Sequence, residues 1–260
     1  MAIHFNELPT EVDPDRINDY LHLVKKSHTI PSESYFKFTV YALRFAYRIE
    51  GMKDKRIELP TIKRSRKLPV VLSQEEVRRL LKAPKLLKHR VLIALLYGCG
   101  LRCFEVRNLK IADLDFDRKI LHVKDGKGKK DRYVPLADLL IRGIKTYLEA
   151  EQPLEWLFNS KGEQIIGRAG GDFDGRYSQR GVQWAVNEAK KKAGILKPMN
   201  VHTLRHTYAT HLLEEGLDIL TIKDLLGHEC IDTTMIYLHV AQTEKCRAFS
   251  PLDRLYLSRK

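Results

Sequence analysis

Residues 201–206 read Val-His-Thr-Leu-Arg-His and lie in a helical pattern. Positions i and i+3 share one face of a helix, so His202 and Arg205 are expected to project together. Two more residues follow in a fixed order: His228, which comes directly after a Leu-Gly pair, and then Tyr237. Each residue has an ordinary structural explanation when taken alone. Their order and spacing are what point to a shared site.

Two motifs earlier in the chain carry cations at positions bounded by glycine. The first is Gly-Leu-Arg-x-x-Glu at 100–105, where a buried helical pattern ends in glycine and a new helix is expected to begin near Arg102. The second is a Gly-Lys-Gly triplet centred on Lys127, at the tip of a predicted β-hairpin with arms at 119–124 and 132–136. Both motifs therefore place a cation at a sharp turn of the backbone.

Taken together, these motifs resemble those of the tyrosine recombinases, also called phage-type integrases. The resemblance is close over about residues 70–245 and loose over 15–50. It implies a mainly α fold with a small antiparallel sheet (α+β), in which a smaller helical core-binding domain precedes a helical catalytic domain and the two close around duplex DNA. The family's catalytic set of Arg, Lys, His-x-x-Arg, His and Tyr maps here onto Arg102, Lys127, His202, Arg205, His228 and Tyr237.

A basic, proline-bounded stretch without apolar periodicity divides the chain, and we interpret residues 58–69 as a linker. Two helical patterns precede it, so residues 1–57 are expected to form the core-binding domain. This domain looks shortened, because the first helix of the family pattern is missing. Ser73 and Glu76 form a predicted capping box that opens the catalytic domain, residues 70–260.

The residue types suit in-line attack on a phosphodiester. Charge that develops on the phosphate oxygens is met by the forked guanidinium donors of Arg102 and Arg205. A phenol has an unperturbed pKa of about 10, so Tyr237 as nucleophile needs the field of these arginines and a base such as His202. No metal, nucleotide or other cofactor is expected, because a phosphotyrosyl ester keeps enough free energy for a second DNA 5′-hydroxyl to rejoin the strand.

Two more residues of the catalytic set and one supporting residue complete this interpretation. Lys127 is expected to protonate the departing 5′ oxygen as a general acid, with Lys129 as its rival on the same hairpin tip. His228 is expected to hydrogen-bond a phosphate oxygen. Glu105, three residues after Arg102, is expected to support that arginine rather than to react.

The composition agrees with a cytoplasmic protein that binds a polyanion. Lys and Arg number 46 against 33 Asp and Glu, which gives a formal net charge of +13. No apolar run approaches the roughly 18 residues of a membrane span, and the N-terminus lacks the basic segment of a signal peptide. The four cysteines form no CxxC pair and are expected to be reduced.

The resemblance also implies assembly on DNA. Recombination joins two duplexes, so we expect a homotetramer on paired sites. Accessory proteins that set direction are compatible with this expectation. The tail at 244–260 has apolar positions at helical spacing and is expected to dock on a neighbouring subunit. Integration of a mobile element, excision, inversion and dimer resolution all stay open.

Three other interpretations share part of this pattern. A type IB topoisomerase uses the same types of catalytic residue, tyrosine, arginine and histidine. It rotates one duplex about a cut strand instead of exchanging strands between two duplexes. An architectural DNA-binding protein would keep the fold without catalysis. A metal hydrolase would use His202, His206 and His211, but no HExxH motif is present and the adjacent Arg205 would repel a dication.

Overall fold

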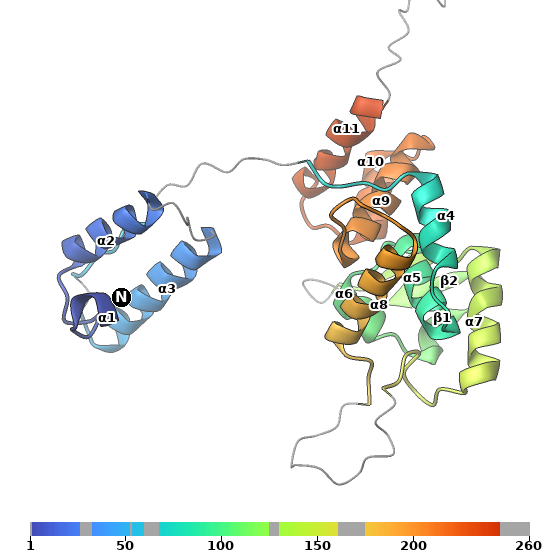
Figure 1. Ribbon diagram of the computed structural model, residues 1–260, viewed down its shortest axis with the longest axis horizontal. Coiled ribbons are helices and arrows are strands. Elements are labelled where there is room, and N and C mark those ends of the chain that lie inside the picture. Colours follow the sequence, from blue (N-terminus) through green and yellow to red (C-terminus); the bar gives the residue numbers. More distant parts are fainter. Residues whose placement is uncertain are drawn as a thin grey trace, which may run out of the picture. The chain divides into compact units, whose positions relative to one another are not determined.

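The computed structural model divides the chain into two compact units, residues 1–67 and 68–260 (Figure 1). Each unit is described by itself. The structure describes residues 2–26, 33–52, 54–59, 68–124, 130–160 and 175–244.

The N-terminal unit is helical. It contains α1 (Ala2–Phe5), α2 (Pro14–Lys26) and α3 (Glu33–Ile49), and the two helical patterns predicted there are confirmed as α2 and α3. The core of the unit joins the two longer helices and the segment that follows them: Val12, Ile17, Leu21, Phe36, Val40, Leu43, Tyr47 and Ile57. The chain after α3 is fastened to this core, because the guanidinium of Arg44 donates two hydrogen bonds to the Ile57 carbonyl at 3.1 and 2.7 Å.

The C-terminal unit packs its helices around a buried central helix. Its helices are α4 (Gln74–Lys82), α5 (Leu87–Gly98), α6 (Cys103–Arg107), the 3-10 helix Ile111–Asp113, α7 (Asp138–Glu151), α8 (Gln179–Lys192), α9 (Val201–Glu214), α10 (Ile219–Leu226) and α11 (Asp232–Glu244). The predicted capping box opens α4, where Ser73 and Glu76 bond each other's backbone N–H groups. Beyond its basic first turn, helix α5 is apolar, and it packs against α7 and α9, which makes it the centre of the core.

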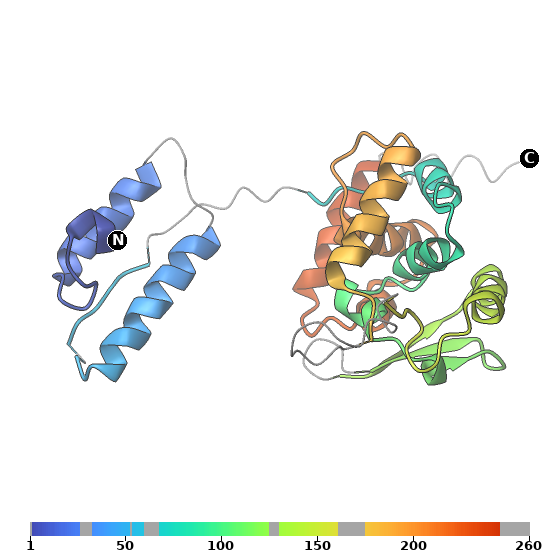
Figure 2. The same cartoon turned by 60° about the horizontal axis from the view of Figure 1, so that its bottom comes forward.

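A small antiparallel sheet completes the unit. Its strands β1 (Leu114–Asp115), β2 (Ile120–Val123) and β3 (Arg132–Pro135) lie in the order β1-β2-β3. Figure 2 shows the sheet along one edge of the unit with α7 beside it. The predicted hairpin is confirmed as β2 and β3, and the expected fold class, mainly α with a small antiparallel sheet, is confirmed as well. Strand β1 and helix α7 were not predicted from the sequence.

The turn between α5 and α6 is the feature that places Arg102. Gly100 has φ of +59°, and a Cβ at this position would come within 2.4 Å of the Tyr208 ring. Any other residue would therefore be strained and would also push α9 away. The tight turn places Arg102 two residues later, as the N-cap of α6, which begins at Cys103.

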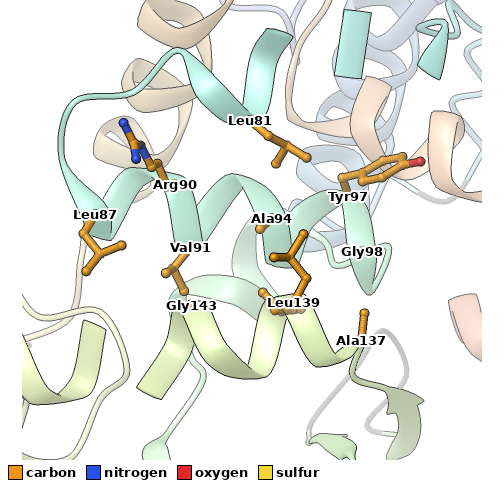
Figure 3. A pocket seen from close by; sticks show the side chains of 11 residues that line it. Leu81, Leu87, Arg90, Val91, Ala94, Tyr97, Gly98, Ala137, Leu139 and Gly143 are labelled. Atoms are coloured by element: carbon orange, nitrogen blue, oxygen red, sulfur yellow. The ribbon is translucent and has the colours of Figure 1, made fainter. Parts of the chain in front are cut away.

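An apolar hollow lies between α4, α5 and α7 (Figure 3). Its lining includes Leu81, Leu87, Val91, Ala94 and Leu139.

Among the residues that the structure describes, no helix is long and apolar enough to cross a membrane.

Candidate active site

A pocket at one end of the C-terminal unit brings the motif residues together. It is lined by Arg102, His202, Arg205, His206, Gly227, His228, Glu229, Cys230, Asp232, Thr233, Ile236 and Tyr237. Five of the six expected catalytic residues are therefore gathered from α6, α9, the turn after α10, and α11. The sixth, Lys127, lies outside the described residues, as does its rival Lys129.

Arg102 enters the pocket from the first turn of α6. Its NH1 donates to Glu105 Oε1 at 2.7 Å, and its backbone N–H donates to Glu105 Oε2 at 2.8 Å. Its NH2 lies 3.3 Å from the Gly227 carbonyl. These contacts hold the guanidinium in one place while 19% of the side chain stays exposed toward the pocket. The arginine is preorganised and still open to an anion.

Glu105 is shared with a buried cation that sequence reasoning missed. Arg132, the first residue of β3, makes a two-bond fork to the Glu105 carboxylate at 2.9 and 2.8 Å. Its Nε donates to the Leu225 carbonyl at 2.7 Å. Burial alone would raise the pKa of Glu105, but the bonds from Arg132 and Arg102 outweigh it and hold the pKa at about 2. Arg132 shares the inward face of its strand with Val134, and an arginine on an apolar face is the signal that could have revealed it.

Arg205 is fixed by carbonyl oxygens from two other segments. Its NH1 donates to Gly100 at 2.7 Å and its NH2 donates to Leu226, while Glu105 Oε2 lies 3.9 Å from NH1. Burial and then the positive charge of Arg102 lower the pKa of Arg205 to about 9. This value is still well above neutral, so two cations remain side by side in the pocket.

His202 lies at the start of α9, where Asn200 and Thr203 form a capping box. It is half-buried, and burial followed by the charges of Arg205 and Arg102 lowers its pKa. The imidazole is therefore neutral at pH 7, with one nitrogen free to donate and the other to accept a hydrogen bond.

His228 follows Gly227, which caps α10 with φ of +64°. A Cβ at Gly227 would meet Arg132 Cδ at 3.1 Å, so glycine lets the buried arginine pass under the turn. His228 Nδ1 is paired with the hydroxyl of Thr234 at 2.9 Å, and Thr234 is fully buried. Burial and the nearby arginines lower the pKa of His228 to about 3. Because Nδ1 of this neutral ring is held by Thr234, Nε2 is the nitrogen that can bond a ligand. Thr234 is, after Arg132, the second positioning residue that the motifs did not reveal.

Tyr237 lies in the middle of α11 and is 1% exposed. Burial raises the pKa of its phenol, while Arg205 and Arg102 act in the opposite direction. Its hydroxyl lies 3.0 Å from Nδ1 of His206, a third residue that the motif analysis did not place in the site. Its signal is spacing: His206 is one helical turn after His202, on the same face of α9.

The metal-hydrolase alternative is not supported by this geometry. His211 is turned to another part of the unit, where its Nδ1 pairs with the Tyr97 hydroxyl at 2.9 Å and its Nε2 with the Leu72 carbonyl at 3.0 Å. Within the described ranges, no three His, Cys, Asp or Glu side chains gather as ligands for a metal ion.

The pocket thus offers the guanidinium groups of two arginines, three neutral imidazoles and one buried phenol. This set is complementary to a singly charged phosphodiester, because the arginines can meet its non-bridging oxygens while the phenol oxygen faces the same space.

The comparisons with known proteins agree with this description. Residues 70–244 match the phage integrase family. A tyrosine recombinase XerA of Thermococcus kodakarensis is 39% identical over 221 residues, which cover 84% of this chain and 74% of the relative. A crystal structure of XerA recombinase has a TM-score of 0.61 at 30% identity and covers 94% of this chain and 85% of its own. The Tn1549 transposon integrase, solved in complex with transposon right end DNA, shares the fold with a TM-score of 0.66 at 17% identity, over 92% and 87% of the two chains.

The fold and the family match thus define an enzyme of the tyrosine recombinase class. The chain belongs to the phage integrase family, as the resemblance of its motifs predicted.

Proposed function

We propose that this protein is a site-specific DNA recombinase that cuts and rejoins duplex DNA through a 3′-phosphotyrosyl intermediate on Tyr237, without a metal ion or ATP. The observation that carries the proposal is the pocket in which one phenol and two fixed arginines meet. The net charge of +13 favours a polyanionic substrate. The DNA bound to the Tn1549 integrase supports the same class of partner.

In the proposed reaction the Tyr237 oxygen attacks the scissile phosphorus in line. The bond from phosphorus to the 5′ oxygen breaks, which leaves a 3′-phosphotyrosyl ester and a free 5′-hydroxyl. Arg102, Arg205 and His228 stabilise the charge on the non-bridging oxygens, and Lys127 supplies the proton to the 5′ oxygen. A 5′-hydroxyl of a second duplex then attacks the ester, which restores a phosphodiester and releases Tyr237.

The wider assembly follows from the same proposal. Residues 1–57 act as the core-binding domain and residues 58–69 as a linker, so that two domains grip one duplex. Four subunits meet on a pair of sites, since two duplexes each need two cuts. Accessory proteins set the direction of exchange in this proposal.

The test is covalent capture from a pool of nicked duplexes with random sequence. The protein is incubated with the pool, denatured, and recovered with any DNA still attached. We expect adducts joined through the 3′ phosphate, an enriched sequence in the captured DNA, and no adduct from Tyr237→Phe. An adduct of normal yield from Tyr237→Phe would contradict the proposal.

The captured sequence then separates the two enzyme alternatives. Plasmids with one or two copies of it are incubated with the protein. A recombinase exchanges strands between paired sites, whereas a type IB topoisomerase relaxes a plasmid without such exchange. An architectural protein would bind without forming an adduct.

A further inference from the structure

Tyr237 and His206 form a buried pair in the pocket. The phenol oxygen and His206 Nδ1 are 3.0 Å apart, which is hydrogen-bond distance. The rings are tilted by 54° with centroids 5.7 Å apart, so they meet through this bond rather than by stacking. Tyr237 is almost fully buried, which leaves little access for water to its hydroxyl. The partner of the proposed nucleophile is therefore an imidazole nitrogen.

His206 is able to accept a proton at neutral pH. Burial, followed by the neighbouring His202 and Arg205, lowers the pKa of His206 to about 4, so the ring is neutral. A neutral imidazole has one protonated and one unprotonated nitrogen. When Nδ1 is the unprotonated nitrogen, the Tyr237 hydroxyl donates to it, and the hydrogen bond already lies along the path of proton transfer.

His202, the base that the motif suggested, has a different position. In the part of the chain that the structure describes it makes no hydrogen bond to Tyr237, although it lines the same pocket one turn earlier on α9. His202 is thus free to donate to a phosphate oxygen. The two histidines of the His-x-x-Arg-His motif therefore differ in their partners: His202 can bond the phosphate, and His206 bonds the nucleophile.

We infer that His206 is the catalytic base for cleavage by Tyr237, an assignment that rests on the proposed function. As the phenol oxygen bonds to phosphorus, its proton passes to His206 Nδ1. The bond from phosphorus to the 5′ oxygen breaks, and that oxygen takes a proton from the general acid. During rejoining a 5′-hydroxyl attacks phosphorus and gives its proton back to the general acid. The bond from phosphorus to the phenol oxygen breaks, and His206 returns its proton to that oxygen. His206 is neutral again at the end of the cycle.

Bound DNA favours this transfer. A phosphodiester between Arg102 and Arg205 neutralises part of the positive charge that lowers the pKa of His206, so the imidazole becomes a stronger base when substrate is present. Bond formation to phosphorus also makes the phenol proton more acidic. We expect a contribution at the lower end of general base catalysis, about 10²-fold in rate.

The test compares two substitutions on the sequence recovered by covalent capture. His206→Asn keeps a side-chain oxygen near the place of Nδ1, which can accept a hydrogen bond but cannot take up a proton. His206→Ala removes both abilities. The readout is the single-turnover rate of adduct formation on a nicked duplex, with DNA affinity and thermal unfolding measured on the same samples.

A matched control exists elsewhere in the unit. His89 Nε2 pairs with the Tyr177 hydroxyl at 3.1 Å, and neither residue lines the pocket. His89→Gln disturbs a pair of the same kind and is expected to cleave at the parent rate.

We expect both His206 variants to cleave about 10²-fold more slowly with DNA affinity within a few-fold of the parent. Replacing Tyr237 by difluorotyrosine, whose phenol is a stronger acid, should restore most of the rate of His206→Asn. Parental cleavage by His206→Asn, with Tyr237→Phe still unable to form an adduct, would overturn the inference and leave the proposed function intact. If the parent itself formed no adduct, the proposed function would fail first.

Discussion

Arg102 shows how a single residue is prepared for catalysis. Its guanidinium is held by Glu105 and lies beside the Gly227 carbonyl before any substrate is bound. Such a donor needs no rearrangement when charge develops on a phosphate oxygen. We predict that Arg102→Ala slows adduct formation by about 10²- to 10³-fold, while DNA affinity falls much less.

The measurement is single-turnover cleavage beside equilibrium binding. Arg78→Ala is the matched control, since Arg78 is exposed on α4 and pairs with Glu75 outside the pocket. Cleavage within a few-fold of the parent, together with a collapse in affinity, would make Arg102 an anchor for the DNA backbone instead.

Glu105 provides a prediction about pH. Its pKa is about 2 in the folded protein against an unperturbed 4.5, so the unfolded chain binds the proton more tightly. The stabilisation from this carboxylate is present above about pH 4.5 and is lost as the pH falls toward 2. The shift corresponds to about 3 kcal/mol.

Chemical unfolding of the parent and of Glu105→Gln between pH 5 and about pH 2 checks this. We expect the variant to be less stable by about 3 kcal/mol or more at pH 5, because Arg132 loses its buried partner. We also expect its stability to depend less on pH in this window. Equal pH slopes for the two proteins would show that Glu105 does not titrate in this way.

Some site residues were predicted from the sequence and others were not. The two groups differ in how far apart along the chain their contacting residues lie. His202 and Arg205 are three positions apart on one helix, so a local rule finds them. Arg132 meets Leu225, 93 positions away, and His206 meets Tyr237, 31 positions away. Local patterns can mark Arg132 and His206 as unusual, but they do not identify the partners of these residues, which are set when β3 and α11 pack against the rest of the unit.

The β2–β3 hairpin is the element that links the expected general acid to the rest of the site. The sequence predicts Lys127 at its tip, and Arg132, the first residue of β3, ties the hairpin to Glu105 and to the end of α10. We predict that a substrate with sulfur in place of the 5′ oxygen restores cleavage by Lys127→Ala, because a thiolate leaves without a proton.

The same substrate should not rescue Arg102→Ala, whose defect concerns the non-bridging oxygens. Cleavage rates of oxygen and sulfur substrates are compared for both variants and for Lys129→Ala. Rescue of Lys129→Ala alone would move the acid role two residues along the hairpin.

Elements with strong local signals were predicted from the sequence, and weaker ones were not. Ser73 caps α4 through its side chain, as the capping box predicted. Helix α7 begins after Ala137 without a side-chain cap and contains Gly143, so its ends carry little signal. Helix α11 packs along α9, a tertiary contact that no local motif predicts.

At the scale of the whole molecule, charge and assembly are connected. Protomers with a net charge of +13 repel one another until DNA phosphates neutralise them. We predict monomers or weak oligomers in free solution and tetramers on paired sites. Deletion of residues 244–260 should preserve binding to one site and abolish strand exchange.

Light scattering with and without DNA and an exchange assay on two sites measure these effects. Full recombination by the truncated protein would contradict the docking of this tail on a neighbouring subunit.

Tyr237 is the residue that we propose to bond covalently to DNA, and the position of this bond can be measured directly. Covalent adducts formed by the parent protein are digested with nuclease and trypsin, and the remaining nucleotide is located by mass spectrometry. The tryptic peptide 224–245 contains a single tyrosine, which makes the assignment direct. We predict a nucleotide linked through its 3′ phosphate to Tyr237, and a nucleotide on any other residue would contradict the account.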